Sequence, residues 1–288
     1  MNLCKDTIFS NLSGSLKTRF RGKAMFKLTK HYFDNIDTHG NLVIAYAAEL
    51  SVLGITIPFS SVITLKEDGE LQEKPLLKRA ELHSQMGGRG FKQAELNAQG
   101  EWRSLANPLP EVELFQVEGK KDKVKSVKWH VHTPLAKCEF TKSDLSIKGL
   151  GYAETLTMDI EPWHLPLKEL YWGRFLSPTH SVVWLEWRGE NPIRLLYHDG
   201  MLQDDFKFKN NVITYEFGEI VLRDTRVIKD EPLVNLAAHF PMVKKLFKKE
   251  FFETREKKFV SRGTLTLHDG TPCEGFALYE RVLWNSVK

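Results

Sequence analysis

The sequence predicts an all-β protein in which many short antiparallel strands form a barrel or a sandwich. Most of its 288 residues alternate between apolar and polar side chains with a period of two, as half-buried strands do. Clusters of Gly, Asn, Asp and Pro interrupt this alternation at short intervals, where the chain turns between strands. One segment, residues 233–258, has helical spacing instead.

The predicted strands follow one another along the chain and are separated by turn residues. In the first half, Gly54 separates two strands, and the turn "KEDGEL" at 66–71 ends the second of them. The loop "QMGGRGF" at 85–91 is not a phosphate-binding loop, because no GKS or GKT follows its glycines. A proline-rich turn at 107–113 precedes the next group. The strands are predicted at 41–65, 123–133, 144–160, 180–189, 191–200, 210–228 and 262–284.

The segment 233–258 is predicted to be a helical insertion in the C-terminal half. Its apolar residues recur close to helical spacing, Pro241 fits the first turn of a helix, and its lysines fall on the other face. We expect this basic amphipathic helix to cover the end of a barrel. Binding to an anionic membrane surface is the alternative.

Glu154 is a lone carboxylate on an otherwise apolar strand face, which it shares with Tyr152, Leu156 and Met158. A buried carboxylate is costly unless it is paired or protonated. Burial raises the pKa of such a group, and a raised pKa suits a general acid. The alternative is that Glu154 pairs with an arginine such as Arg174 and only orders the core.

The last predicted strand repeats this pattern. Glu280 again falls on an apolar face, and both strands open with Gly–aromatic–Ala, in "GYAETLTM" and "GFALYERV". The repetition indicates an internal duplication with a boundary near residue 160. The predicted domains are 1–160 and 161–288, and the second contains the helical segment.

Aromatic residues gather between Gly149 and Trp187, where four of the seven tryptophans lie. Aromatic side chains that line a concave surface bind flat or hydrocarbon ligands. Ordinary packing between two β layers is the alternative. The predicted catalytic groups are Glu154, Asp159 and His164. The predicted ligand-binding residues are Tyr152, Trp163, Tyr171, Trp172, Arg174 and Trp184.

Composition and charge exclude several classes of function. The 41 basic residues barely exceed the 37 acidic ones, which argues against a nucleic-acid-binding protein. Cys4, Cys138 and Cys273 lie far apart without a CxxC pair, so free thiols in a reducing compartment are expected. The N-terminus makes a poor signal peptide, and no apolar run reaches the roughly 18 residues of a membrane span. We therefore predict a cytoplasmic protein.

The motif "WHVH" at 129–132 raises the question of a metal site. His130 and His132 share a strand face, as two ligands of a cupin-type site do, but Pro134 intervenes before the next glutamate, Glu139. Hydrogen-bonded or exposed histidines are the preferred interpretation. HExxH, GxSxG, zinc-type cysteine spacing and nucleotide fingerprints do not occur in the sequence, so neither a metal nor a cofactor is predicted.

The chain resembles the family of carotenoid 1,2-hydratases and AttH-like proteins. The shared features are the Gly–x–Gly–aromatic opening at Gly149–Tyr152, the "WG" strand at Trp172–Gly173 and the alternating strand Val182–Trp187. The closing "EGFALYERVLW" resembles the last strand of that family. The resemblance covers residues 125–200 and 262–284 and implies a tandem lipocalin-like fold, with two up-and-down barrels packed together.

The sequence also departs from the hydratases that it resembles. Those proteins carry an Asp/His cluster near a histidine–asparagine–tryptophan–glycine run, whereas this chain has "AETLTMDIEPWHLPL", with Asp159 and His164 in another arrangement. The family further includes proteins that only bind, or that fold a substrate for cyclisation. The resemblance therefore implies a small apolar ligand, isoprenoid- or polyketide-like, without implying carotenoid hydration.

These observations predict a lipocalin-like protein that binds such a ligand, or that catalyses its hydration, cyclisation or isomerisation by acid without a cofactor. The first alternative is a non-enzymatic interaction or membrane-surface protein that uses the helix 233–258. The second is a sugar-binding β-protein, which requires exposed tryptophans.

Overall fold

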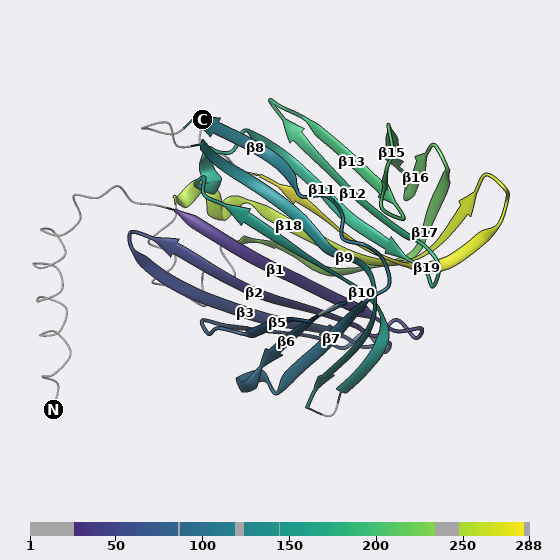
Figure 1. Ribbon diagram of the computed structural model, residues 1–288, viewed down its shortest axis with the longest axis horizontal. Coiled ribbons are helices and arrows are strands. Elements are labelled where there is room, and N and C mark those ends of the chain that lie inside the picture. Colours follow the sequence, from purple (N-terminus) through teal and green to yellow (C-terminus); the bar gives the residue numbers. More distant parts are fainter. Residues whose placement is uncertain (1–25, 86, 119–123, 144, 234–247, 285–288) are drawn as a thin grey trace, which may run out of the picture.

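The computed structural model describes residues 26–85, 87–118, 124–143, 145–233 and 248–284, whose strands form two antiparallel sheets (Figure 1). β8 (Val112–Glu118) pairs with β9 beside the main row of the first sheet. That row is β4 (Leu71–Leu76), β3 (Ile55–Leu65), β2 (Leu42–Val52), β1 (Lys27–Ile36), β10 (Leu145–Met158), β9 (Val124–Lys142), β7 (Ala98–Ser104), β6 (Gly88–Gln93) and β5 (Glu81–Gln85).

The second sheet contains the C-terminal strands. Its row is β14 (Met201–Leu202), β13 (Ile193–His198), β12 (Ser181–Gly189), β11 (Leu167–Leu176), β19 (Pro272–Leu283), β18 (Arg255–Leu267), β17 (Gly218–Pro232), β16 (Val212–Tyr215) and β15 (Phe206–Lys209). Two short 3-10 helices, η1 (Ala94–Leu96) and η2 (Pro162–His164), lie outside the sheets. The all-β prediction is confirmed.

The two sheets repeat one strand order. In each, the first strand lies between the second strand and the last one: β1 pairs with β2 and β10, and β11 pairs with β12 and β19. This is the order of an up-and-down barrel, and among the described strands it is open between β4 and β5 and between β14 and β15. Glu154 on β10 and Glu280 on β19 therefore occupy equivalent positions.

Each sheet uses its two faces for two different cores. One face of the first sheet holds Phe33, Phe91 and Trp102, and one face of the second holds a separate cluster around Trp184. The other two faces pack against each other and form the largest apolar cluster, which includes Tyr32, Trp129, Met158, Tyr152, Trp172, Leu185, Val260 and Leu278. This packed region, called the inter-sheet face below, contains Tyr152 and Met158 as the strand phasing predicts.

The predicted helical insertion is not seen in the described part of 233–258; residues 234–247 lie outside that part. η3 (Lys249–Glu253) is a short 3-10 helix, and from Arg255 the chain runs as β18, paired with β17 and β19. A strand is favoured here because alternation turns Glu256 and Lys258 inward, where they form an ion pair. No helix among the described residues is long and apolar enough to cross a membrane.

A buried ion pair joins the two sheets. Asp34 on β1 and Arg174 on β11 are both fully buried, and the guanidinium donates to the two carboxylate oxygens at 2.6 and 3.2 Å. The third nitrogen of Arg174 donates to the carbonyl of Phe276 at 2.8 Å. A bidentate contact of this kind fixes the orientation of the two side chains and neutralises their charges. It therefore holds β1 of the first sheet and β11 of the second in a defined relative position.

Replacing Arg174 by Met should lower the free energy of unfolding by about 3–5 kcal/mol, because it leaves the Asp34 carboxylate buried without a partner. The double variant Asp34→Leu/Arg174→Met should recover most of that loss. Urea unfolding of the single and double variants measures both values.

Arg188→Met is the matched control. Arg188 also contacts two carboxylates, Glu169 and Glu186, but its side chain is exposed, so the loss should stay below about 1 kcal/mol. Equal losses at Arg174 and Arg188 would contradict the role given to the buried pair.

Candidate functional site

Glu154 is a buried acid on the inter-sheet face. The pairing of β10 with β9 shifts register on both sides of Ala153, a bulge that redirects the following side chain. From the first sheet, the Oε2 atom of Glu154 accepts hydrogen bonds from Trp129 Nε1 at 2.5 Å and from the Tyr152 hydroxyl at 2.6 Å. From the second sheet, Trp172 Nε1 donates to the same oxygen at 3.0 Å.

The surroundings of Glu154 favour its protonated form. Burial raises the pKa of this carboxyl, and the opposing effects of Lys30 and of the hydrogen bonds from Tyr152 and Trp129 are smaller. The alternative that Arg174 neutralises Glu154 is wrong, because the guanidinium pairs with Asp34 instead. The donors that reach Glu154 are neutral groups.

The equivalent glutamate of the second half has a cationic partner. Glu280 accepts from Nζ of Lys258, whose side chain is buried and also pairs with Glu256 at 2.7 Å. The same ammonium group lies 5.9 Å from the centre of the Tyr46 ring. Two glutamates in equivalent positions therefore have opposite environments, one with neutral donors and one with a buried ammonium group.

A cavity of about 310 Å³ opens between the sheets at the end of the inter-sheet face. Its polar groups include two guanidinium groups, those of Arg174 and Arg262. Leu150 on β10 lines this cavity. Glu154 follows four residues later on the same strand, and since a strand rises about 3.3 Å per residue, the two residues are roughly 13 Å apart. Two carboxylate residues, Asp37 and Glu274, also line the cavity. Its apolar side chains are those of Ile36, Leu150, Leu176, Pro178 and Phe276.

Four of the predicted site residues lie on the inter-sheet face. Tyr152 and Trp172 donate to Glu154, and their rings meet edge to face at 5.7 Å between centroids. Arg174 follows Trp172 on the same face of β11 and lines the cavity. The structure therefore brings together Tyr152, Glu154, Trp172 and Arg174.

Two predicted aromatic residues of the second sheet lie elsewhere. Trp184 is buried on the opposite face of that sheet, where its ring packs against Phe208 and Tyr279. Tyr171 lies between the guanidinium groups of Arg188 and Arg281, at 4.4 and 5.4 Å from its ring centre. Neither contacts Glu154.

The remaining predicted residues lie beyond the end of β10. Asp159 accepts a hydrogen bond from the backbone N–H of Ser126 at 2.5 Å, which holds the ends of β9 and β10 together. His164 is exposed, 3.7 Å from the carboxylate of Glu161. Trp163 is buried and packs against other aromatic rings. The structure does not bring Asp159, Trp163 or His164 to Glu154.

Other aromatic and histidine residues also have defined places. His132 is hydrogen-bonded to the Thr155 hydroxyl at 2.7 Å, and His31 is hydrogen-bonded to the same hydroxyl at 2.9 Å. For His132 this agrees with the preferred interpretation of the "WHVH" motif.

All seven tryptophans lie among the described residues and none is exposed, which contradicts the exposed platforms that the sugar-binding alternative requires.

Sequence reasoning missed Asp34 and Trp129. Asp34 lies on β1, which was not among the predicted strands, because "KLTKHYFDNI" does not alternate between apolar and polar residues. Trp129 shares a strand face with Val131 in the "WHVH" motif, and period-two phasing of that strand would have placed its indole beside an apolar face.

Comparisons with known proteins support the fold. No protein-family model matches the sequence, and no curated protein matches it. The crystal structure of CghA with Sch210972 has a TM-score of 0.55 at 10% identity, covering 91% of this chain and 90% of that one. Kievitone hydratase from Nectria haematococca has a TM-score of 0.52 at 8% identity, covering 90% and 89%. At such identities the likeness shows the fold alone, and the lipocalin-like architecture is confirmed.

The variant Glu154→Gln should gain stability relative to the wild type as pH rises. A carboxyl with a higher pKa in the folded than in the unfolded state binds its proton more tightly when folded. As pH rises from about 4.3, the pKa of the unfolded state, to the higher pKa of the folded state, the free energy of unfolding of the wild type falls. Above the folded-state pKa it falls no further. Urea unfolding at several pH values measures this difference, and a difference independent of pH would contradict the raised pKa.

Glu154→Leu is the matched comparison for Glu154→Gln. Leucine leaves the buried N–H groups of Trp129 and Trp172 and the hydroxyl of Tyr152 without an acceptor, whereas glutamine keeps one oxygen for them. The leucine variant should be at least about 2 kcal/mol less stable than the glutamine variant. Equal stabilities would show that the three donors find other partners.

Proposed function

We propose that this chain binds a small, largely apolar molecule between its two sheets, and that protonated Glu154 is the acid when this molecule reacts. One observation carries the proposal: a buried carboxyl with neutral donors lies on the same inter-sheet face as an apolar cavity. Two fold neighbours are consistent with it, since one was solved with Sch210972 and the other is named a hydratase.

The environment of Glu154 suits proton transfer to a carbon–carbon double bond. Burial raises the pKa of the carboxyl and so favours the protonated form that the reaction needs. After the proton has moved to carbon, the three donors from Trp129, Tyr152 and Trp172 stabilise the carboxylate that remains. Addition of water to the cation then releases a proton that restores the acid. Attack by a second double bond instead forms a ring and a new cation, which returns a proton to the carboxylate as a double bond forms.

The position of the cavity defines how the ligand must lie. Tyr152 comes between Leu150 and Glu154 on the same face of β10, and the Asp34–Arg174 pair lies at the cavity end of that face. Arg174, Tyr152 and Glu154 are buried, so these side chains must move apart before the reactive end of the ligand reaches the carboxyl. The other end of the ligand stays among the apolar side chains at the mouth.

Replacing Leu150 by Trp should fill the cavity and weaken binding of an apolar anionic probe, 8-anilinonaphthalene-1-sulfonate, by at least tenfold. Leu71→Trp, at an exposed position that does not line this cavity, is the control and should leave binding unchanged. A fluorescence titration measures both variants. Unchanged binding in Leu150→Trp would contradict the site.

Mass spectrometry of small molecules that co-purify with the protein tests binding and chemistry separately. The wild type should carry an apolar molecule that Leu150→Trp lacks. Glu154→Gln should carry a related molecule that has not been hydrated or cyclised. The same molecule in wild type and Glu154→Gln would support a carrier and contradict the acid role.

A further inference from the structure

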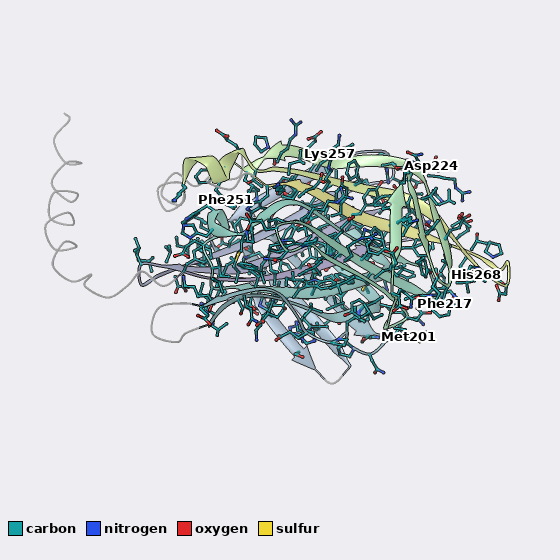
Figure 2. The ribbon with its side chains drawn as sticks, turned by 90° about the horizontal axis from the view of Figure 1, so that it is seen from above. Met201, Phe217, Asp224, Phe251, Lys257 and His268 are labelled. Atoms are coloured by element: carbon teal, nitrogen blue, oxygen red, sulfur yellow. The ribbon has the colours of Figure 1, made fainter. Side chains whose placement is uncertain are left out.

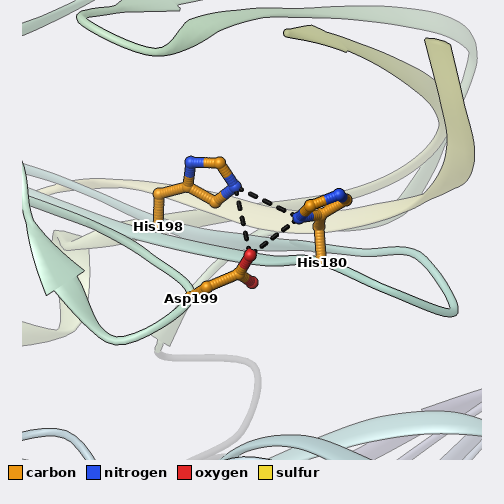
Figure 3. A group of neighbouring side chains, drawn as sticks. All are labelled: His180, His198 and Asp199. Carbon is orange, nitrogen blue, oxygen red and sulfur yellow. Dashed lines mark hydrogen bonds and ion pairs between the residues drawn. The ribbon is translucent and has the colours of Figure 1, made fainter. Parts of the chain in front are cut away.

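A second cluster of ionisable side chains lies on the second sheet, away from the inter-sheet face. Figure 3 shows His180, His198 and Asp199 turned toward one another. Nδ1 of His180 lies 2.7 Å from Oδ2 of Asp199, and Nε2 of His198 lies 3.3 Å from the same oxygen. The two imidazole nitrogens are 3.4 Å apart. Two imidazole nitrogens and one carboxylate oxygen, all possible metal ligands, therefore lie within 3.4 Å of one another.

The hairpin that joins β13 to β14 fixes Asp199. Asp199 and Gly200 have φ values of +49° and +85°, and His198 pairs with Met201, as in a two-residue type I′ turn. The backbone N–H of Asp199 donates to the carbonyl of Ser181 at 2.8 Å, and its Oδ1 accepts from the N–H of Ser181 at 2.7 Å. Oδ2 is left to face the two histidines.

A second turn fixes His180. The hydroxyl of Ser177 accepts from the backbone N–H of His180 at 2.9 Å, and the N–H of Ser177 donates to the carbonyl of His180, also at 2.9 Å. The register of β12 with β13, in which Val182 opposes His198, then brings His180 next to Asp199. Two tight turns thus hold the cluster in place.

Tyr215 orients the buried imidazole of His198. Its hydroxyl lies 3.4 Å from Nδ1 of His198, and the two rings meet edge to face at 5.5 Å between centroids. If Nδ1–H donates to this oxygen, Nε2 keeps its lone pair toward the cluster. Metal-binding histidines are commonly held in this way by a partner on the other nitrogen.

We propose that His180, His198 and Asp199 bind a divalent transition-metal ion of the Zn²⁺ class. Bonds of about 2.0–2.1 Å to nitrogen and oxygen place neighbouring ligand atoms roughly 2.8–3.4 Å apart in octahedral or tetrahedral sites. Two of the three separations lie in that range, and the third, a hydrogen bond, must open slightly. Two imidazoles and one carboxylate favour zinc, cobalt or iron over magnesium or calcium.

The charge and exposure of the site are compatible with an ion. The Asp199 carboxylate supplies the one anionic ligand of the site, since imidazoles bind a metal in their neutral form. His180 and Asp199 remain partly open to solvent, so water can supply further ligands. Met201 and Phe217, which lie beside the cluster at one end of the molecule (Figure 2), are exposed apolar residues.

Calorimetric titration of the chelator-treated protein with Zn²⁺, and with Co²⁺ followed by visible absorption, tests this site. We expect one saturable equivalent, a cobalt spectrum with nitrogen ligands, and a higher melting temperature with Zn²⁺. Asp199→Asn removes the charged ligand yet keeps a residue that tolerates positive φ, so it should fold and bind at least tenfold more weakly. His180→Ala should weaken binding similarly.

His83→Gln is the matched control, because His83 also contacts a carboxylate, that of Glu101, at 2.7 Å, but has no second histidine beside it in the described structure. Its zinc affinity should equal that of the wild type. Failure of the wild type to bind a saturable equivalent would overturn the proposal and leave a hydrogen-bonded cluster. Binding that survives in both Asp199→Asn and His180→Ala would overturn it as well, because the ion would then bind elsewhere.

Discussion

The two sheets can pack only if the ionisable groups on their shared face are satisfied without water. Asp34 and Arg174 satisfy each other across the sheets, and Lys258 satisfies the carboxylates of Glu256 and Glu280. Glu154 differs, because its partners are two indoles and one phenol. Neutral donors do not offset the cost of a buried negative charge as a cation does, and burial raises the pKa of this carboxyl. Burial raises the pKa of Asp34 too, but there the charge of Arg174 opposes the rise.

The repeated strand order allows the partners of Glu154 and Glu280 to be compared directly. β10 and β19 hold the same place in their sheets, and each carries a glutamate on the inter-sheet face. Lys258 on β18 neutralises Glu280, whereas the position opposite Glu154 on β9 is occupied by Val131. Equivalent positions with different neighbours therefore give one glutamate with a cationic partner and one with neutral donors. Trp172, which comes from the second sheet, ties this acid to the contact between the halves.

The sequence predicts the part of this site that depends on local geometry. Period-two phasing places Glu154 and Tyr152 on one buried face because a strand alternates its side chains. It cannot tell which residues meet Glu154 across the sheets, because that depends on packing; Arg174 was weighed as its partner, and Trp172 is the residue that reaches it. Helical spacing after residue 233 misled for Arg255–Lys258, where strand pairing overrides periodicity.

The protonation state of Glu154 is the claim on which this account depends. A ¹³C NMR titration of protein labelled at the glutamate carboxyl carbons, assigned by the signal that is lost in Glu154→Gln, measures its pKa directly. We expect a midpoint above the ordinary value of about 4.3 for glutamate. A midpoint at or below that value would mean that the three donors stabilise a carboxylate, and the proposed acid would be a structural group.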